Sequence, residues 1–307
     1  MKHITSTHGI DHLVESYHEH LREVRGLATL TCAQRARQVR DFLTAQWKGA
    51  GGELELWQLG GEEILGYLTR RRVHCEAVTL QYLASTLRSF LRFLILTRQC
   101  PAGVVQAVPK IQAGPRVGLA DYLTEAQLHR LLNSLDAQTP EGACAQALIL
   151  CLARLGLRAG EAAHLALDDL DWRQATLRLT QTKGRQDRLL PLSPTVGKAL
   201  AHYLRFARPA TPHRQVFVSR PGGIPLSGVR VSQLVAKALG QANLVFPHPG
   251  VQLLRRTFAT HLAQKGSTPK EIADLLGHRG LNTIGFYARV NLPMLQAVVQ
   301  PWPEVLP

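Results

Sequence analysis

The chain has 307 residues, of which 45% are hydrophobic and 19% charged, a composition that excludes a disordered chain and is long enough for two globular domains. Its net charge of +14 at pH 7 favours a polyanionic partner, because lysine and arginine neutralise phosphates and release their counterions. Five cysteines without paired metal-ligand spacing, no apolar signal core and no run long enough to span a membrane predict a cytoplasmic protein with reduced thiols and no membrane partner.

The first hundred residues have the hydrophobic periodicity of helices. The clearest pattern runs from Thr79 to Thr97, where apolar side chains recur every three or four residues: Leu80, Leu83, Leu87, Phe90 and Leu94. Shorter helical patterns occupy three further stretches: 11–25, 32–47 and 61–72. The other face of the 79–97 helix is polar and basic, and it either lies against phosphates or faces solvent; its residues are Ser85, Arg88, Ser89 and Arg92.

A change of composition separates two regions of the chain. From Pro101 to Leu119 the helical pattern gives way to Pro, Gly and Val, which is typical of a linker. A new helix is predicted after Thr124, since a threonine at the N-cap and Gln127 three residues later form a capping box. We therefore expect three parts: a helical domain at 1–108, a linker at 109–119 and a second domain at 120–307.

The second domain mixes helices with short strands. Helical patterns occupy 125–135, 141–155, 194–207, 228–241, 250–265, 269–276, 282–288 and 292–299. Strand patterns occupy 164–167, 175–181 and 187–192. Thr268 and Gly277 fit the N-cap and C′ positions of the 269–276 helix. The predicted fold class is mainly α, with a small antiparallel β-sheet in the second domain.

Four segments of the second domain carry residues suited to phosphate chemistry. Arg158 lies between two glycines, and Lys183 lies at the turn between two predicted strands. Arg255 lies in the run Leu-Leu-Arg-Arg-Thr-Phe-Ala-Thr-His-Leu, and His278 precedes Tyr287 by nine residues. Taken singly, each has an ordinary explanation: a surface arginine, a solvated lysine, a histidine behind a helix end, or a core tyrosine.

Together and in this order, these residues resemble the tyrosine recombinase (phage integrase) family, and the resemblance covers nearly the whole chain. It implies a two-domain DNA clamp: a core-binding, SAM-like domain at 1–108 and a catalytic domain at 120–307. The helix at 292–299 would dock in a neighbouring protomer; the alternative is that it folds back onto its own domain. The implied partner is a double-stranded recombination site, held by a tetramer of this chain or shared with a second recombinase. Residues expected to contact the DNA outside the catalytic set are Ser85, Arg88, Arg92, Arg185 and Arg256.

The resemblance also implies a role for each catalytic residue. Tyr287 is the nucleophile, which forms a 3′-phosphotyrosine and releases a 5′-hydroxyl. Arg158 and Arg255 clamp the scissile phosphate with planar guanidinium groups. Lys183 is the general acid for the leaving oxygen, and His278 binds the phosphate or positions the tyrosine. No metal or nucleotide cofactor is expected, because the phosphotyrosine conserves the energy of the broken bond.

One position departs from the family pattern. Family members usually have a histidine three residues before the second arginine, where this chain has Gln252. Glutamine donates a hydrogen bond to a phosphate oxygen but cannot accept a proton near neutral pH. Either water or another group then takes the proton of Tyr287, or His248 does so from the same side of a helix that begins near Pro249. The alternative is that His248 is only a loop residue.

Two rival functions share part of this pattern. A DNA-binding regulator without catalysis would use the stretch 270–278, which looks like the opening of a helix-turn-helix motif, but it has no need for the catalytic residues in recombinase order. A type IB topoisomerase shares the nucleophile chemistry, but the chain length and C-terminal helix are Xer-like. Within the recombinase function, Gln252 favours integration, excision or resolution of a mobile genetic element over chromosome-dimer resolution.

Overall fold

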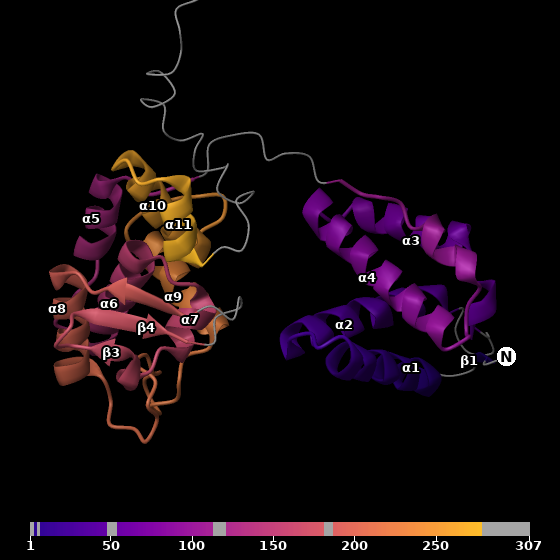
Figure 1. Cartoon of the computed structure of the whole chain (residues 1–307), viewed down its shortest axis with the longest axis horizontal. Coiled ribbons are helices and arrows are strands. Elements are labelled where there is room, and N and C mark those ends of the chain that lie inside the picture. Colours follow the sequence, from indigo (N-terminus) through magenta and orange to yellow (C-terminus); the bar gives the residue numbers. More distant parts are fainter. Residues whose placement is uncertain (1–2, 5–6, 48–53, 113–120, 181–186, 278–307) are drawn as a thin grey trace, which may run out of the picture. The chain divides into compact units, whose positions relative to one another are not determined.

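The computed structural model describes residues 3–4, 7–47, 54–112, 121–180 and 187–277. The chain divides into two compact units, Met1–Val117 and Gly118–Pro307 (Figure 1), each with its own buried apolar core. The predicted helices at 282–288 and 292–299 lie outside the described residues. Within the described ranges, no helix is both long and apolar enough to cross a membrane.

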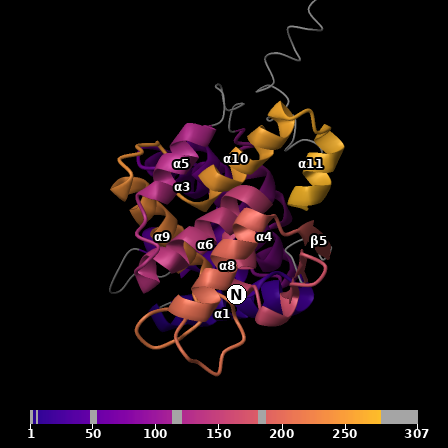
Figure 2. The same ribbon diagram turned by 90° about the vertical axis from the view of Figure 1, so that its left-hand side faces the viewer.

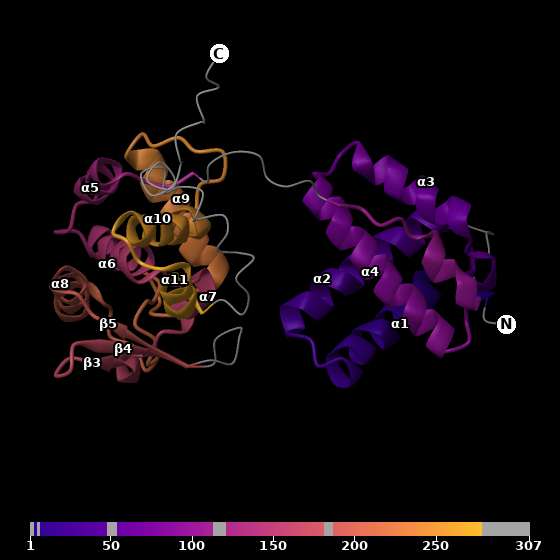
Figure 3. The ribbon, with the colours of Figure 1, turned by 45° about the horizontal axis from the view of Figure 1, so that its top comes forward.

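The first unit is a helical bundle around α4 (Ala77–Leu96). The five apolar residues whose spacing predicted this helix are all buried. α4 runs between the pair α1 and α2 on one side and α3 on the other (Figure 1, Figure 3), and the helices predicted in this region are confirmed. The remaining elements are β1 (His3–Ile4), paired with β2 (Leu54–Glu55), α1 (Thr7–Glu19), the π-helical turn η1 (His20–Val24), α2 (Thr29–Gln46), the 3-10 turn η2 (Leu56–Gln58) and α3 (Gly61–Arg72).

The stretch that begins at Pro101 is packed against this bundle. Residues Ala102–Ala107 form the 3-10 helix η3, and Val104 and Val108 are buried in the helical core. Arg88 of α4 donates hydrogen bonds to the carbonyls of Val108 (3.4 Å) and Pro109 (2.5 Å). A 3-10 helix of this length is too short to leave a helical period in the sequence, so composition alone indicated a linker.

The second unit packs helices around α6 (Pro140–Leu155), most of whose residues are buried. α6 contacts α7, α8, α9 and α10, and α8 lies along it (Figure 2). A smaller apolar cluster joins α11 to α10. The bounds of the other helices are α5 Glu125–Asn133, α7 Ala159–His164, α8 Pro194–His202 with the π-helical turn η5 Tyr203–Ala207, α9 Gly228–Gln241, α10 Val251–Gln264 and α11 Pro269–Leu276.

The predicted antiparallel sheet is confirmed, with three strands in the order β3-β4-β5. Their bounds are β3 Leu170–Asp171, β4 Thr176–Leu179 and β5 Arg188–Pro191. Alternate residues face the core, so Leu177 and Leu190, which pair across β4 and β5, are both buried. Arg188 lies on this buried face opposite Leu179, whereas Leu189 is exposed. The sheet therefore buries an arginine and leaves the adjacent leucine in solvent.

The strand predicted at 164–167 is wrong. α7 extends to His164, Ala166 forms only an isolated bridge with Gln215, and a 3-10 turn, η4 (Leu167–Asp169), follows. α7 has six residues, too few for a hydrophobic period to be recognised. Leu165, which follows it, is buried, and its carbonyl accepts a hydrogen bond from the amide of Val216 in a distant segment.

The ends of two helices follow from capping signals in the sequence. Thr124 and Gln127 form the expected capping box, Thr268 caps α11, and Gly277 ends that helix in the left-handed conformation. The start of α10 is a correction, since the helix begins at Val251 and not near Pro249. A glycine at position 250 with φ 146° precedes it, a backbone conformation that ends helical continuity.

Candidate active site

The candidate active site lies where two helices end. α6 and α11 each finish with a glycine in the left-handed conformation, Gly156 at φ 64° and Gly277 at φ 61°. A side chain at Gly156 would collide with Phe258 and Leu276, so this end of α6 lies directly against α10 and α11. The last carbonyls of a helix have no partner within it and carry a partial negative charge. In both helices, arginine side chains donate hydrogen bonds to these carbonyls.

Arg255 of α10 joins the two helix ends. Its side chain is buried; Nη1 donates to the carbonyl of Gly156, and Nη2 donates to the carbonyl of Leu276 at 2.5 Å. A buried guanidinium is tolerated only where acceptors surround it. The helix ends provide such acceptors and thereby fix the plane of the Arg255 side chain.

Arg158 approaches the same place from the N-cap of α7. Its Nη2 donates to the carbonyl of Gly277 at 2.9 Å, and its Nη1 donates to Oε1 of Glu161 at 2.6 Å. The side chain is 25% exposed, and a guanidinium carries five N–H donors, of which these contacts use two. Arg158 therefore retains donors on an accessible side of the site.

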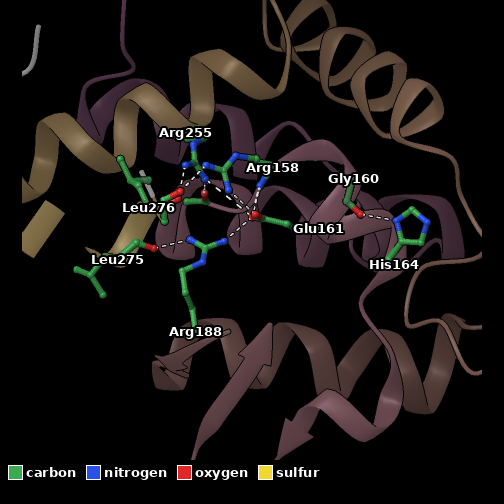
Figure 4. Close-up of polar contacts among 10 residues, drawn as sticks. Arg158, Gly160, Glu161, His164, Arg188, Arg255, Leu275 and Leu276 are labelled. Carbon is green, nitrogen blue, oxygen red and sulfur yellow. Dashed lines mark hydrogen bonds and ion pairs between the residues drawn. The ribbon is translucent and has the colours of Figure 1, made fainter. Parts of the chain in front are cut away.

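Glu161 is the carboxylate of the cluster, and it was not singled out from the sequence. Its side chain is 7% exposed and contacts three arginines: Arg158 at 2.6 Å, Arg188 at 2.7 Å and Arg255 at 3.9 Å (Figure 4). Burial alone would raise its pKa, but the hydrogen bond from the Arg158 backbone and the nearby guanidinium charges outweigh burial and lower it. The signal for this residue was its place three residues after Arg158, the N3 position from which a glutamate accepts a hydrogen bond from the N-cap backbone amide.

Arg188 is the second residue that sequence reasoning missed. It reaches the cluster from β5: Nη1 donates to the carbonyl of Leu275 at 2.6 Å, and Nη2 lies 2.7 Å from Oε2 of Glu161 (Figure 4). Burial lowers its pKa, and the charge of Glu161 opposes that shift. Three consecutive carbonyls at the end of α11, at positions 275, 276 and 277, thus accept from three different arginines.

The cluster has an excess of positive charge. In the part of the chain that the structure describes, three guanidinium groups share the single carboxylate of Glu161, which leaves two net positive charges. Helix ends offset part of this excess with their partial negative charge. Such a site is suited to an anion that presents several oxygens, such as a phosphate. Within the described residues, no group of three or more His, Cys, Asp or Glu side chains is placed to hold a metal ion.

Three further predicted residues lie at or near the start of α10. Gln252 is exposed in the first turn, three residues before Arg255, and residues at this spacing are neighbours on a helix surface. His248 is exposed in the segment before the helix, so the helical geometry expected to align it with Gln252 is absent. Arg256 is half-buried, and its Nε and Nη2 are buried without a hydrogen-bond partner among the described residues.

Four predicted residues lie outside the described residues: Lys183, Arg185, His278 and Tyr287. Their chain neighbours are informative in two cases. The stretch that holds Lys183 lies between β4 and β5, whose first residue is Arg188. Gly277, the residue before His278, accepts a hydrogen bond from Arg158.

The predicted DNA-contacting stripe on α4 is narrower than expected. Arg92 is exposed and Ser85 half-buried, but the guanidinium of Arg88 contacts the carbonyls of its own unit. Ser89, which we expected on the polar face, is buried. The apolar stripe of α4 is wide, because the helix is packed on more than one side.

Comparison with known proteins identifies the family. Residues 121–292 match the Phage integrase family, and residues 14–98 match its N-terminal SAM-like domain. The chain belongs to the phage integrase family. It is therefore an enzyme, a site-specific recombinase of the tyrosine type, and its mostly helical fold with a small antiparallel sheet is the fold of tyrosine recombinases.

Relatives of this phage integrase family member cover nearly its whole length. It is 32% identical to y4rA of Sinorhizobium fredii, named as a candidate integrase/recombinase, over 96% of this chain and 71% of that protein. It is 30% identical to the tyrosine recombinase XerD of Listeria monocytogenes, over 93% of this chain and 96% of XerD.

Solved structures share the fold at low sequence identity. The XerH site-specific recombinase, bound to a palindromic difH substrate in a post-cleavage complex, matches with a TM-score of 0.72 and 16% identity over 95% of this chain and 83% of XerH. A lambda integrase(75–356) dimer bound to a COC′ core site matches with a TM-score of 0.70 and 18% identity over 90% of this chain and 94% of the integrase.

Proposed function

We propose that this recombinase cleaves and rejoins double-stranded DNA through a 3′-phosphotyrosine at Tyr287, with Arg158 and Arg255 binding the scissile phosphate. The observation that carries the proposal is the arginine cluster at the ends of α6 and α11. A phosphodiester has one negative charge, and the five-coordinate phosphorus formed during attack has two. Two net positive charges in the cluster match that second state, so the site stabilises the transition state more than the substrate.

The cleavage step forms one bond to phosphorus and breaks another, with one proton lost by the nucleophile and one gained by the leaving group. The phenol oxygen of Tyr287 bonds to phosphorus, the bond from phosphorus to the 5′ oxygen breaks, and Lys183 protonates the departing oxygen. His278 binds a phosphate oxygen. Rejoining reverses these steps with a new 5′-hydroxyl as the nucleophile. The roles of Lys183, His278 and Tyr287 come from the family pattern, and those of the two arginines are supported by their geometry.

Gln252 has a phosphate-binding role in this scheme. It lies on the exposed side of the first turn of α10, three residues before Arg255, and its amide donates a hydrogen bond to a phosphate oxygen. The proton of Tyr287 then passes to water, or to His248 as an alternative acceptor. His248→Ala tests the second route: a cleavage rate equal to wild type excludes His248 as the acceptor.

The biological role is the mobility of a genetic element by integration, excision or resolution, carried out by a tetramer on two DNA duplexes in the cytoplasm. Support comes from the similarity to the y4rA protein and to the Tn1549 transposon integrase, whose structure matches with a TM-score of 0.68 at 17% identity. Chromosome-dimer resolution, the role of an Xer-type enzyme, is the alternative. A regulator without catalysis is not favoured, because it would not require three arginines to share one buried carboxylate beside two helix ends.

Covalent trapping tests the proposal. Wild type and Tyr287→Phe are incubated with a nicked suicide duplex that carries the end sequence of the element, and the products are separated under denaturing conditions. We expect a protein–DNA adduct with wild type and none with Tyr287→Phe, although both bind the duplex in a gel-shift assay. Tight binding without an adduct would favour the regulator, and an adduct that persists in the variant would assign the nucleophile elsewhere.

A further inference from the structure

The buried Arg188 has no part in the catalytic roles assigned above. It lies on the inner face of the sheet with 6% of its side chain exposed, whereas the adjacent Leu189 is 63% exposed. Burying a cation while leaving a leucine in solvent is the reverse of what core packing favours. Replacement of buried ion pairs by apolar residues is often neutral or stabilising, so stability alone does not account for an arginine here.

Arg188 competes with the phosphate-binding arginines for one carboxylate. Oε2 of Glu161 lies 2.7 Å from Nη2 of Arg188 but 3.9 Å from Nη1 of Arg255, and Oε1 lies 2.6 Å from Nη1 of Arg158. The backbone amide of Arg158 also donates to Oε2, at 2.9 Å. Because Coulomb attraction falls with distance, the charged partner of Oε2 is Arg188 and not Arg255. Arg255 instead donates to backbone carbonyls, which carry only partial charge.

Arg188 also fixes the end of α11. Its hydrogen bond to the Leu275 carbonyl is adjacent to the two carbonyls that accept from Arg255 and Arg158. A Cβ atom at Gly277 would lie 3.0 Å from Nε of Arg188, so the guanidinium is in close contact with the backbone there. One side chain thus links β5, the carboxylate of α7 and the end of α11.

We propose that Arg188 is a positioning residue of the recombinase: it occupies one oxygen of Glu161 and the Leu275 carbonyl, and so keeps the charges of Arg158 and Arg255 directed at the scissile phosphate. This inference rests on the proposed function of those two arginines. Without Arg188, Glu161 turns to Arg255, and the net charge of the cluster falls from two positive charges to one. The transition state, with two negative charges, then loses more stabilisation than the bound substrate, so the cleavage rate falls more than DNA affinity.

The test measures the single-turnover rate of adduct formation on saturating suicide DNA, together with DNA affinity and thermal unfolding. Arg188→Met is expected to lower that rate roughly 100-fold, as the loss of one transition-state charge interaction does, with DNA affinity within about threefold of wild type. Arg188→Lys keeps a charge beside Glu161 and is expected to stay within about tenfold of wild type. Arg178→Met removes an arginine from the exposed face of β4 and is the control for the loss of a charge from the sheet.

A double variant separates positioning from simple structural support. Removing the carboxylate together with Arg188, in Glu161→Gln/Arg188→Met, restores two net positive charges, so its rate is expected to exceed that of Arg188→Met at least about tenfold. A structural role would make the double variant as slow or slower, and that result would overturn the inference. Equal rates for Arg188→Met, Arg178→Met and wild type would also overturn it.

Two controls keep this test independent of other failures. If Arg188→Met does not fold, Arg188→Lys becomes the variant that tests the proposal. A folded Arg188→Lys that forms the adduct as slowly as Arg255→Ala would contradict it. If wild type gives no adduct that depends on Tyr287, the proposed function itself is wrong, whatever Arg188 does.

Discussion

Arg92 in the first unit and Arg255 in the second are the same residue type in opposite surroundings. Arg92 is exposed on α4, whereas Arg255 is 3% exposed and donates to two helix ends. An exposed cation is screened by salt and remains mobile, so we expect it to contribute to DNA affinity without selecting a geometry. A buried cation in a fixed plane recognises one arrangement of oxygens. We therefore expect DNA affinity to depend mainly on exposed arginines and the cleavage rate on buried ones.

The largest effect is expected at Arg255. Arg255→Ala should lower the adduct rate about 10²–10³-fold, the scale for loss of a preorganised donor. It should also lower the free energy of unfolding by roughly 2–4 kcal/mol, because two buried carbonyls lose their partner. Arg256→Ala, on the next residue, is the control: it should weaken DNA binding and leave the rate at saturating DNA near wild type. Normal cleavage by Arg255→Ala would show that this buried arginine does not determine the cleavage rate.

Two glycines with a positive φ, Gly277 and Gly266, differ in what surrounds them. Gly277→Ala should lower the adduct rate about tenfold and the free energy of unfolding by about 1–2 kcal/mol, since it adds both backbone strain and a contact 3.0 Å from Arg188. Gly266 also has a positive φ, of 87°, but nothing lies within 4 Å of an added Cβ. Gly266→Ala should therefore reduce stability alone. Equal rates for the two variants would show that the Arg188 contact is unimportant.

Arg154 lies between the extremes of Arg92 and Arg255, since its side chain is 27% exposed. It donates two hydrogen bonds of 2.6 Å to the carboxylate of Glu125 on α5. Those hydrogen bonds lower the pKa of this carboxyl group from 4.5 to about 2. Because the pKa is depressed in the folded state, the stabilisation is present above about pH 4.5 and is lost as the pH falls towards 2. The free energy of unfolding of wild type, measured with urea, should fall over that range, and that of Glu125→Gln should fall less.

The control for Glu125→Gln is Glu141→Gln, which removes an exposed carboxylate from the first turn of α6. It should follow the wild-type pH dependence below pH 4.5. A wild-type curve that is flat from pH 4.5 to 2 would contradict the role of the ion pair with Arg154.

The smallest effects are expected on α4. Arg92→Ala should weaken DNA binding about two- to tenfold, with an effect that shrinks at high salt, and it should leave thermal unfolding unchanged. Arg88→Ala should instead cost about 1 kcal/mol of stability, since the carbonyls of Val108 and Pro109 lose its hydrogen bonds. Gel-shift titrations at two salt concentrations and thermal melts distinguish them. A large loss of stability in Arg92→Ala would break the distinction between exposed and buried arginines.

The sequence was most informative where a signal is local. The spacing of Leu80, Leu83 and Leu87 predicted α4, and the capping box at Thr268 with the glycine at 277 predicted both ends of α11. Each of these signals lies within one element, so it is independent of how the elements pack. The resemblance to a family supplied the rest of the catalytic prediction, including the arginines at 158 and 255.

Glu161 and Arg188 could not be found in this way, because their importance is set by tertiary structure. Arg188 precedes two leucines, and nothing in that strand indicates that the arginine faces inward. Its surroundings come from α7 and α11, which are distant in sequence. The mistaken strand at 164–167 has the same origin, since the backbone partner of Leu165 comes from the distant segment near Val216.

The two helix ends have a consequence for how quickly the enzyme becomes ready to act. Each end carries about half a negative charge, so α6 and α11 together present about as much charge to the arginines as one phosphodiester group. The guanidinium groups are thereby ordered by the fold itself, and the loss of side-chain entropy occurs during folding and not on encounter with DNA. A phosphate that arrives displaces little and reorganises little. Recognition of the scissile group should accordingly be limited by alignment of the duplex and not by assembly of the pocket.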